Sequence, residues 1–172
     1  MTKPKLISIS GSVHSGKTTV SRILALRDPN AAYLDGDLIG QLVKMRNPDR
    51  QGIEPNLPDV HKLVIKIVKA NLLVGTDVII DYPFNDELRQ KMLTGLKGIE
   101  FEAFWFLLKP DMQKVLKGSA TRPDLNDWEI ERVKYHYSSS LMETKMATVI
   151  DSTNQTAEET AVEITRCIED VV

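Results

Sequence analysis

Short apolar runs alternate along the chain with longer stretches in which apolar residues recur every three or four positions. The short runs are typical of buried strands, and the longer stretches predict helices. Strands are expected at residues 6–10, 31–34, 78–80, 101–108 and 148–150. Helices are expected at 17–26, from 38 to about 45, between Asp59 and Gly75, from Asn85 to about 97, shortly after Pro110, at 128–146, and from Thr156 onward. This alternation predicts an α/β protein with three layers, in which helices cover both faces of a five-stranded, mainly parallel sheet.

Capping signals support the helix assignments. Asn85 is a preferred N-cap residue, and Thr156 with Glu159 forms the pattern of a capping box. Residues 1–172 are expected to form a single domain, because no linker composition interrupts them. Two polar stretches, at about 38–60 and 118–127, are expected to be mobile segments over a site.

The loop after the first strand has the pattern Gly-x-x-x-x-Gly-Lys-Thr. Glycines at both ends let the loop wrap back, so that successive backbone N–H groups point toward phosphate oxygens. Lys17 is expected to be an exposed ligand of the β and γ phosphates, and the Thr18 hydroxyl a ligand of Mg²⁺. The strand–loop–helix context supports a nucleotide site at Gly11, Ser12, Val13, His14, Ser15, Gly16, Lys17, Thr18 and Thr19. His14 is expected to be a variable loop position rather than a catalyst.

Two carboxylates, Asp35 and Asp37, follow the second strand. Ligands of doubly wound sheets bind at the carboxyl ends of the strands, so both should lie near the phosphate loop. A carboxylate there can orient water bound to Mg²⁺ or accept the proton of an attacking hydroxyl. The alternative is that they form a turn that only caps the next helix.

Other P-loop classes fit less well. The chain has no Asn-Lys-x-Asp guanine motif, no Leu-Ser-Gly-Gly-Gln signature, and too little length for a helical lid domain. The phosphate loop, Leu34-Asp35-Gly36-Asp37, Val78-Ile79-Ile80-Asp81 and the arginines before the last strand together resemble the small P-loop kinases. These include the shikimate, gluconate, adenylylsulfate, nucleoside-monophosphate and zeta-toxin kinases. The layout covers nearly the whole chain, but only the phosphate loop is a specific motif.

The resemblance implies a role for particular residues. Asp35 is similar to the aspartate that holds Mg²⁺-bound water, and Asp37 to the one that faces the acceptor hydroxyl. Asp81 takes the place of the Walker B acid, or of the aspartate in the Asp-Gly-x-Pro-Arg turn of nucleotide kinases. Thr18, Asp35 and Asp81 form the implied metal site. Arg122 resembles the lid arginine that clamps ATP phosphates, and Arg132 a second arginine in some members. Lys17, Asp37, Arg122 and Arg132 are thus the implied catalytic residues.

Several positions depart from every subfamily. Gly40 stands where adenylylsulfate kinases and zeta toxins carry arginine, and Phe84 where nucleotide kinases do. Arg46, Arg50 and Arg89 could supply a cation, but a solvated surface position is expected for each. Tyr82 and Phe84 could stack on a substrate or belong to the core. Surface or packing positions are expected for Lys114, Lys117, His61, His136, Trp105 and Trp128.

Composition narrows the partners. The 172 residues carry a formal net charge of −2, which gives no basic field for nucleic acid or an anionic membrane. The chain has a single cysteine, Cys167, and therefore no internal disulfide. No apolar run is long enough to span a membrane, and no secretory signal is seen, so a cytoplasmic protein is expected. The expected partners are ATP with Mg²⁺ and a small-molecule acceptor, while the oligomeric state stays open.

The sequence is therefore interpreted as an ATP-dependent phosphotransferase that acts on a hydroxyl or phosphate of a small molecule. A nucleotide-binding switch or ATPase acting on a partner protein is the alternative. A toxin or resistance kinase acting on a nucleotide sugar or antibiotic is a further one. The acceptor itself is not predicted, because its contacts would fall in 38–60 and 82–90, where no family pattern holds.

Overall fold

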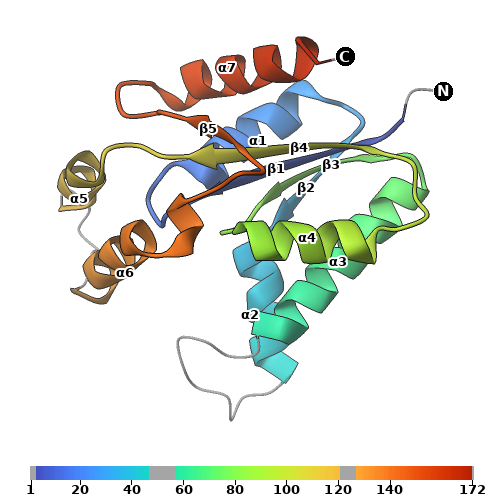
Figure 1. Cartoon of the computed structure of the whole chain (residues 1–172), viewed down its shortest axis with the longest axis horizontal. Helices are drawn as coiled ribbons and strands as arrows, with labels where there is room; N and C mark the ends of the chain where they lie inside the picture. Colours follow the sequence, from blue (N-terminus) through green and yellow to red (C-terminus); the bar gives the residue numbers. More distant parts are fainter. Residues whose placement is uncertain (1–2, 47–56, 121–126, 172) are drawn as a thin grey trace.

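One parallel sheet organises the protein in the computed structural model, which describes residues 3–46, 57–120 and 127–171 (Figure 1). Its strands are β1 (Lys5–Gly11), β2 (Ala31–Asp35), β3 (Asp77–Asp81), β4 (Glu102–Leu108) and β5 (Thr148–Ile150). The helices are α1 (Lys17–Arg27), α2 (Gly36–Arg46), α3 (Leu57–Leu73), α4 (Asp86–Gly95), α5 (Met112–Ala120), α6 (Asp127–Ser138) and α7 (Ala157–Glu169), with a 3₁₀ turn, η1 (Ser140–Met142).

The strand order is β2-β3-β1-β4-β5, and every pairing is parallel. The register sets Asp35 beside Asp81 at the ends of β2 and β3, and Asp81 beside Ile9 of β1. The carboxyl ends of three adjacent strands therefore meet next to the loop that follows β1. This is the edge where open α/β sheets bind ligands.

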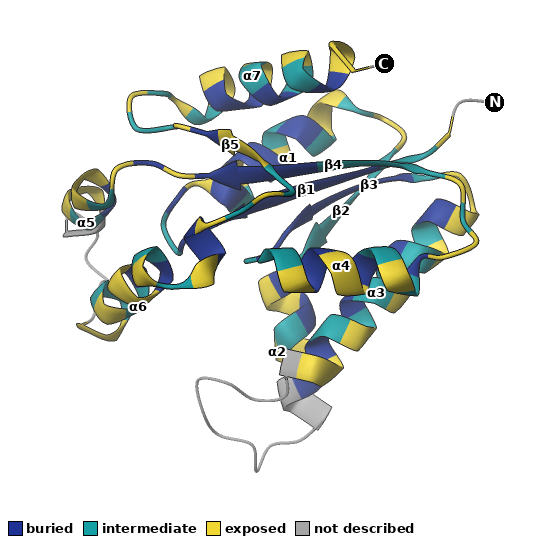
Figure 2. Cartoon of the chain, in the orientation of Figure 1, coloured by how far each residue is buried: buried dark blue, intermediate teal, exposed yellow. Residues whose placement is uncertain are grey.

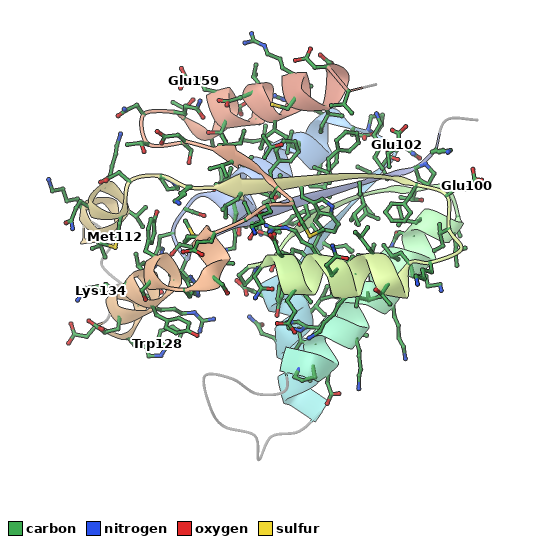
Figure 3. All side chains as sticks on the ribbon, viewed as in Figure 1. Glu100, Glu102, Met112, Trp128, Lys134 and Glu159 are labelled. Atoms are coloured by element: carbon green, nitrogen blue, oxygen red, sulfur yellow. The ribbon has the colours of Figure 1, made fainter. Side chains whose placement is uncertain are left out.

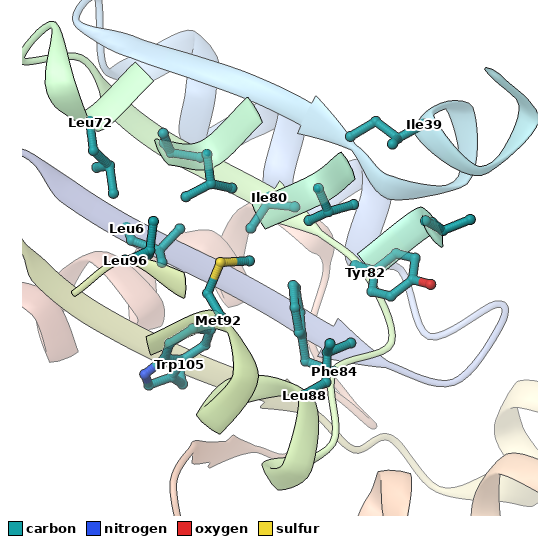
Figure 4. Packing of buried hydrophobic residues seen from close by; sticks show 14 of the residues in the cluster. Leu6, Ile39, Leu72, Ile80, Tyr82, Phe84, Leu88, Met92, Leu96 and Trp105 are labelled. Atoms are coloured by element: carbon teal, nitrogen blue, oxygen red, sulfur yellow. The ribbon is translucent and has the colours of Figure 1, made fainter. Parts of the chain in front are cut away.

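Helices cover both faces of the sheet, as the alternation of strands and helices predicted. One face packs against α2, α3 and α4 through the cluster shown in Figure 4, which includes Leu6, Ile80, Met92 and Trp105. The other face packs against α1 and α7. Because side chains alternate along a strand, Val78 and Ile80 face the first layer and Ile79 faces the second. Dark buried stripes on the inner sides of the helices mark the two core layers in Figure 2.

The predicted caps at the starts of α4 and α7 are confirmed. Asn85 Oδ1 accepts a hydrogen bond from the Leu88 N–H at 2.9 Å. Thr156 and Glu159 form the reciprocal capping box. Both devices pair N–H groups that the first helical turn leaves without partners.

Three predicted helix boundaries were wrong. α2 begins at Gly36, and α3 at Leu57, so Asp59 lies in the first turn of α3. The helix expected at 128–146 ends at Ser138 and is followed by η1. The serine side chains explain this end, because Ser139 Oγ donates to the His136 carbonyl and accepts from the Leu141 N–H. Such local bonds compete with the helical ladder.

Within the described ranges, no helix is long and apolar enough to cross a membrane. The segments expected to be mobile lie partly outside those ranges. Residues 47–56 and 121–126 are not described, whereas residues 38–46 and 57–60 belong to α2 and α3.

Candidate nucleotide and acceptor site

The loop after β1 has the backbone of a phosphate cradle. Gly11 has φ 154°, and a Cβ there would lie 2.5 Å from Ser15 Oγ and 2.9 Å from the Leu108 carbonyl oxygen. Gly16, at φ 87°, is the left-handed N-cap of α1. The loop turns back on itself through a hydrogen bond from the Ser15 N–H to the Ser12 carbonyl at 3.3 Å. His14 takes the left-handed region at φ 62°, which is uncommon for a residue other than glycine.

Lys17 lies in the first turn of α1 and is buried, with 8% of its surface exposed. The expectation of an exposed lysine was therefore wrong. Its ammonium is close enough to Asp81 to lower the pKa of that carboxyl and close enough to His136 to lower the pKa of that imidazole. The cation is thus held inside the loop instead of extending into solvent. Of the other predicted loop residues, Ser12 and Ser15 are buried, whereas Thr19 is exposed on α1.

Asp81 is a buried carboxylate at the end of β3, with 3% of its surface exposed. Oδ2 accepts a hydrogen bond from the Tyr33 hydroxyl at 3.3 Å, and Oδ1 has no hydrogen-bond partner among the described residues. Burial raises the pKa of Asp81, and the nearby Asp35 adds to this, while the Thr18 hydroxyl and Lys17 act in the opposite direction. Burial of Tyr33, together with the carboxylates of Asp81 and Asp35, raises the pKa of the Tyr33 hydroxyl to about 12. Asp81 is therefore a buried carboxylate with one oxygen, Oδ1, that no described residue pairs by a hydrogen bond in this structure.

Asp35 has a structural role that the turn alternative anticipated. Its Oδ1 accepts the backbone N–H groups of Asp37 at 3.0 Å and Leu38 at 3.1 Å, so it caps the first turn of α2. Gly36 is required here, because a Cβ would lie 2.2 Å from a ring carbon of Tyr82. The cap holds Asp35 next to Asp81. Because the two carboxylates are close, the charge of Asp35 helps to raise the pKa of Asp81.

The donors in this corner fit a magnesium ion that is held mainly by nucleotide phosphates. Thr18 supplies a hydroxyl, and Asp35 and Asp81 supply carboxylates, one with a buried oxygen that no described residue pairs by a hydrogen bond. Mg²⁺ in such sites keeps several waters and takes only one or two carboxylates. In the described parts of the chain, no three His, Cys, Asp or Glu side chains form a cluster that could hold a metal without the phosphates.

Replacing Asp81 by Asn is expected to stabilise the nucleotide-free protein while weakening Mg²⁺-dependent ATP binding. Because the folded-state pKa is raised above 3.8, ionisation of Asp81 costs more in the folded protein than in the unfolded chain. The loss of folding stability caused by this ionisation is largest above the raised pKa. It decreases as the pH falls below that pKa toward 3.8. Thermal unfolding should show a higher melting temperature than wild type at pH 8, and this gain should shrink as the pH is lowered toward 3.8. A lower melting temperature at pH 8 would contradict a net cost of the buried charge.

A cavity of about 270 Å³, the α4–α6 cavity, is lined in part by His136, which contacts the phosphate loop. Its lining includes His61, Tyr82, Leu88, Lys91, Arg132 and His136. Burial raises the pKa of Tyr82 to about 12, the Asp37 carboxylate adds to this, and Arg132 acts against it. Asp37 is exposed at the start of α2 and is not among the residues that line this cavity.

A second cavity of about 280 Å³, the α5–α7 cavity, is lined in part by the phosphate loop itself. Its lining includes His14, Gly16, Lys114, Val115, Ser152 and Thr160. Lys114 is exposed on the helix surface, as expected, and it also lines this cavity and donates to Asn154 Oδ1 at 3.0 Å. The phosphate loop thus lines the α5–α7 cavity directly and meets the α4–α6 cavity through its contact with His136.

Arg132 lies on the side of the α4–α6 cavity, and its guanidinium carbon is 5.1 Å from the centre of the Trp128 ring. Trp128 is partly exposed on α6 (Figure 3), so it serves as a platform for Arg132 as well as packing. Arg132 Nε is buried without a hydrogen-bond partner among the described residues. Arg122, the predicted lid arginine, lies outside the described residues, as does Arg50.

His136 is the site residue that sequence reasoning missed. Its Nδ1 accepts a hydrogen bond from the Val13 N–H at 3.2 Å and lies 3.4 Å from Ser12 Oγ. Burial, with Arg132 and Lys17, lowers the pKa of His136 to about 4, so the ring is neutral. No local pattern could reveal this contact, because the two residues are 123 positions apart.

Two aromatic residues after β3 belong to the core, which was one of the two alternatives. Tyr82 is 6% exposed, Phe84 is fully buried, and their rings meet edge to face at 5.3 Å. Tyr82 nevertheless also lines the α4–α6 cavity. Trp105 is buried, as expected.

The surface position expected for Arg89 was wrong, because this side chain is fully buried. Its Nη1 contacts Asp86 Oδ1 at 2.6 Å and Thr144 Oγ1 at 3.1 Å. Thr144 also donates to Asp86, so the three side chains tie α4 to the segment before β5. The cation therefore acts inside this network and does not reach either cavity.

No protein-family model and no curated protein matches the sequence. Solved structures do match the fold over nearly the full chain. The tunicamycin resistance protein of Deinococcus radiodurans is 21% identical, with 96% of this chain and 95% of that one covered and a TM-score of 0.70. A sugar kinase from Janibacter is 14% identical, with coverage of 96% and 95% and a TM-score of 0.72.

A gluconokinase from Sinorhizobium meliloti gives a similar result. It is 14% identical, covers 99% of this chain and 97% of its own, and has a TM-score of 0.69. At such identities the likeness concerns the fold. The chain has the fold of the small P-loop kinases, as the sequence resemblance predicted.

Proposed function

We propose that the protein is a kinase that transfers the γ-phosphoryl group of ATP to a small molecule. The observation that carries the proposal is that Ser15 and Gly16 of the phosphate loop line the α5–α7 cavity, while the same loop contacts His136, whose ring lines the α4–α6 cavity. A phosphotransferase needs a donor site and an acceptor site that share one transferring group. A switch acting on a partner protein would need only the first.

The α5–α7 cavity suits the nucleoside part of ATP. Gly16 and Ser15 of the loop line it, so a nucleotide whose phosphates enter the loop would extend into it. Ser152, Thr153 and Gln155 offer hydrogen-bonding groups, and Val20 and Val115 offer apolar contact. This mixture suits a flat, polar-edged base.

The α4–α6 cavity suits the acceptor, and its charges indicate which kind. Lys91 and Glu87 form an ion pair at 2.6 Å, so they contribute little net charge. Burial lowers the pKa of both His61 and His136, which leaves the two rings neutral. Among the described residues of the lining, Arg132 is a cation that forms no ion pair with another described residue. We infer that the acceptor is a hydroxyl compound that carries a negative group for Arg132.

In the proposed reaction, the acceptor oxygen bonds to the γ-phosphorus while the bond from that phosphorus to the ADP oxygen breaks. The hydroxyl proton passes to Asp37, whose carboxylate acts on Tyr82 of the α4–α6 cavity and makes no capping bond like that of Asp35. Lys17 stabilises the charge on the transferring group. Bound Mg²⁺ would neutralise phosphate charge from the corner formed by Thr18, Asp35 and Asp81.

Three pools of hydroxyl compounds test the acceptor assignment: anionic hydroxy acids, neutral polyols, and cationic amino alcohols. Wild-type protein is expected to consume ATP with the anionic pool. Arg132→Gln should lower kcat/KM for that pool by about 30-fold or more, as expected when one partner of a buried charge pair is removed. Its ATP affinity should stay within about threefold of wild type. Turnover only with the neutral or cationic pool would contradict the assignment.

A further inference from the structure

The phosphate loop touches α6 at two consecutive residues. The Val13 N–H donates to His136 Nδ1 at 3.2 Å, and His14 Nε2 lies 3.6 Å from Glu129 Oε1. Glu129 and His136 are seven positions apart and therefore lie on the same side of the helix. One side of α6 thus runs along the loop that would hold the nucleotide phosphates.

The hydrogen bond defines the state of the His136 ring. Nδ1 accepts the Val13 N–H and so carries no proton, and in the neutral ring the proton then sits on Nε2. The ring also lines the α4–α6 cavity. His136 therefore contacts the phosphate loop with one nitrogen while its helix forms a wall of the acceptor cavity.

A nucleotide in the loop would compete for this hydrogen bond. Backbone N–H groups of such a loop bind phosphate oxygens, and Val13 belongs to this loop. A phosphate oxygen is charged, and hydrogen bonds to charged acceptors are about twice as strong as those between neutral groups. The neutral imidazole is thus the weaker of the two acceptors.

We propose that His136 is a positioning residue that holds the Val13 N–H when the nucleotide site is empty and yields it to a phosphate of ATP. Release of this bond shifts α6, and with it Arg132 and Ser139 of the α4–α6 cavity. ATP binding thereby prepares the acceptor cavity, and the acceptor in turn affects ATP binding by the same factor. This inference rests on the proposed function, because it assumes ATP in the loop.

The wild-type protein allows a direct test. An N–H···N hydrogen bond gives a scalar coupling between the two ¹⁵N nuclei, here Val13 N and His136 Nδ1. The coupling should be present without nucleotide and vanish when ATP·Mg²⁺ saturates the protein. Other loop amides report whether ATP has bound. A coupling that persists with ATP bound would overturn the inference and leave the kinase proposal standing, whereas no ATP binding at all would overturn both.

Two nearly isosteric variants give an independent readout. His136→Asn keeps an acceptor for the Val13 N–H, and His136→Leu removes it. The His136→Leu variant should bind ATP·Mg²⁺ about 2- to 12-fold more tightly than the His136→Asn variant. This is the range expected for one net hydrogen bond that no longer competes with the nucleotide. If His136 only supported the loop, the His136→Leu variant would bind ATP with the same affinity as the His136→Asn variant or more weakly. The coupling experiment decides the question if either variant fails to fold.

Discussion

Lys17→Ala is expected to weaken ATP·Mg²⁺ binding by about 100-fold or more and to reduce phosphoryl transfer at least as much. The lysine is buried in the loop, and its ammonium acts on both Asp81 and His136. A nucleotide phosphate in the loop would replace those partners with a stronger one. Loss of one partner of such a buried charge pair costs about 2–5 kcal/mol. Calorimetric titration with ATP in the presence of Mg²⁺ measures the change.

Lys66→Ala is the matched control, because Lys66 is an exposed lysine on α3. It should bind ATP like the wild type. Lys17→Ala should also keep the secondary structure, although its nucleotide-free melting temperature should fall, since Asp81 loses a compensating cation. A Lys17→Ala variant that binds and turns over ATP normally would contradict the phosphate-loop assignment.

Asp37→Asn is expected to lower transfer to the acceptor by about 100-fold and to leave ATP·Mg²⁺ affinity near that of wild type. An amide has almost the same size but cannot take the acceptor proton, and positioned acid–base groups contribute about 10²–10⁴-fold in rate. The lower end applies, because the proton moves late in a loose phosphoryl-transfer transition state. Steady-state kinetics with the best compound of the anionic pool, beside ATP titrations, separates the two effects.

Asp35→Asn provides the contrast, because it keeps a capping oxygen for α2 but removes the charge beside Asp81. It should weaken the Mg²⁺-dependent part of ATP binding, which Asp37→Asn should not. If Asp37→Asn equals wild type in every assay, Asp37 is not the base. The switch alternative then becomes the better account.

The fold could be predicted from the sequence because its signals are local. Each strand is a short apolar run, each helix has its own periodicity, and the phosphate loop is eight consecutive residues. The caps at Asn85 and Thr156 depend on neighbours three positions away. Interactions between residues this close in the sequence do not depend on how distant parts of the chain pack.

Features that depend on distant partners could not be predicted. Arg89 is buried because Asp86 and Thr144, 55 residues away, accept its hydrogen bonds. His136 meets Val13 only because α6 and the loop after β1 come together in space, 123 positions apart in the sequence. The charge of the α4–α6 cavity likewise emerges from residues on α3, α4 and α6.

The central claim is that the γ-phosphoryl group of ATP reaches a small molecule. Incubation of the protein with ATP labelled in the γ-phosphate, Mg²⁺ and the anionic pool tests it directly, with the labelled products separated and identified. We expect the label in one phosphorylated hydroxyl compound with the wild-type protein and almost none in that compound with the Lys17→Ala variant. Label that appears only in inorganic phosphate, at a rate that no pool changes, would contradict it.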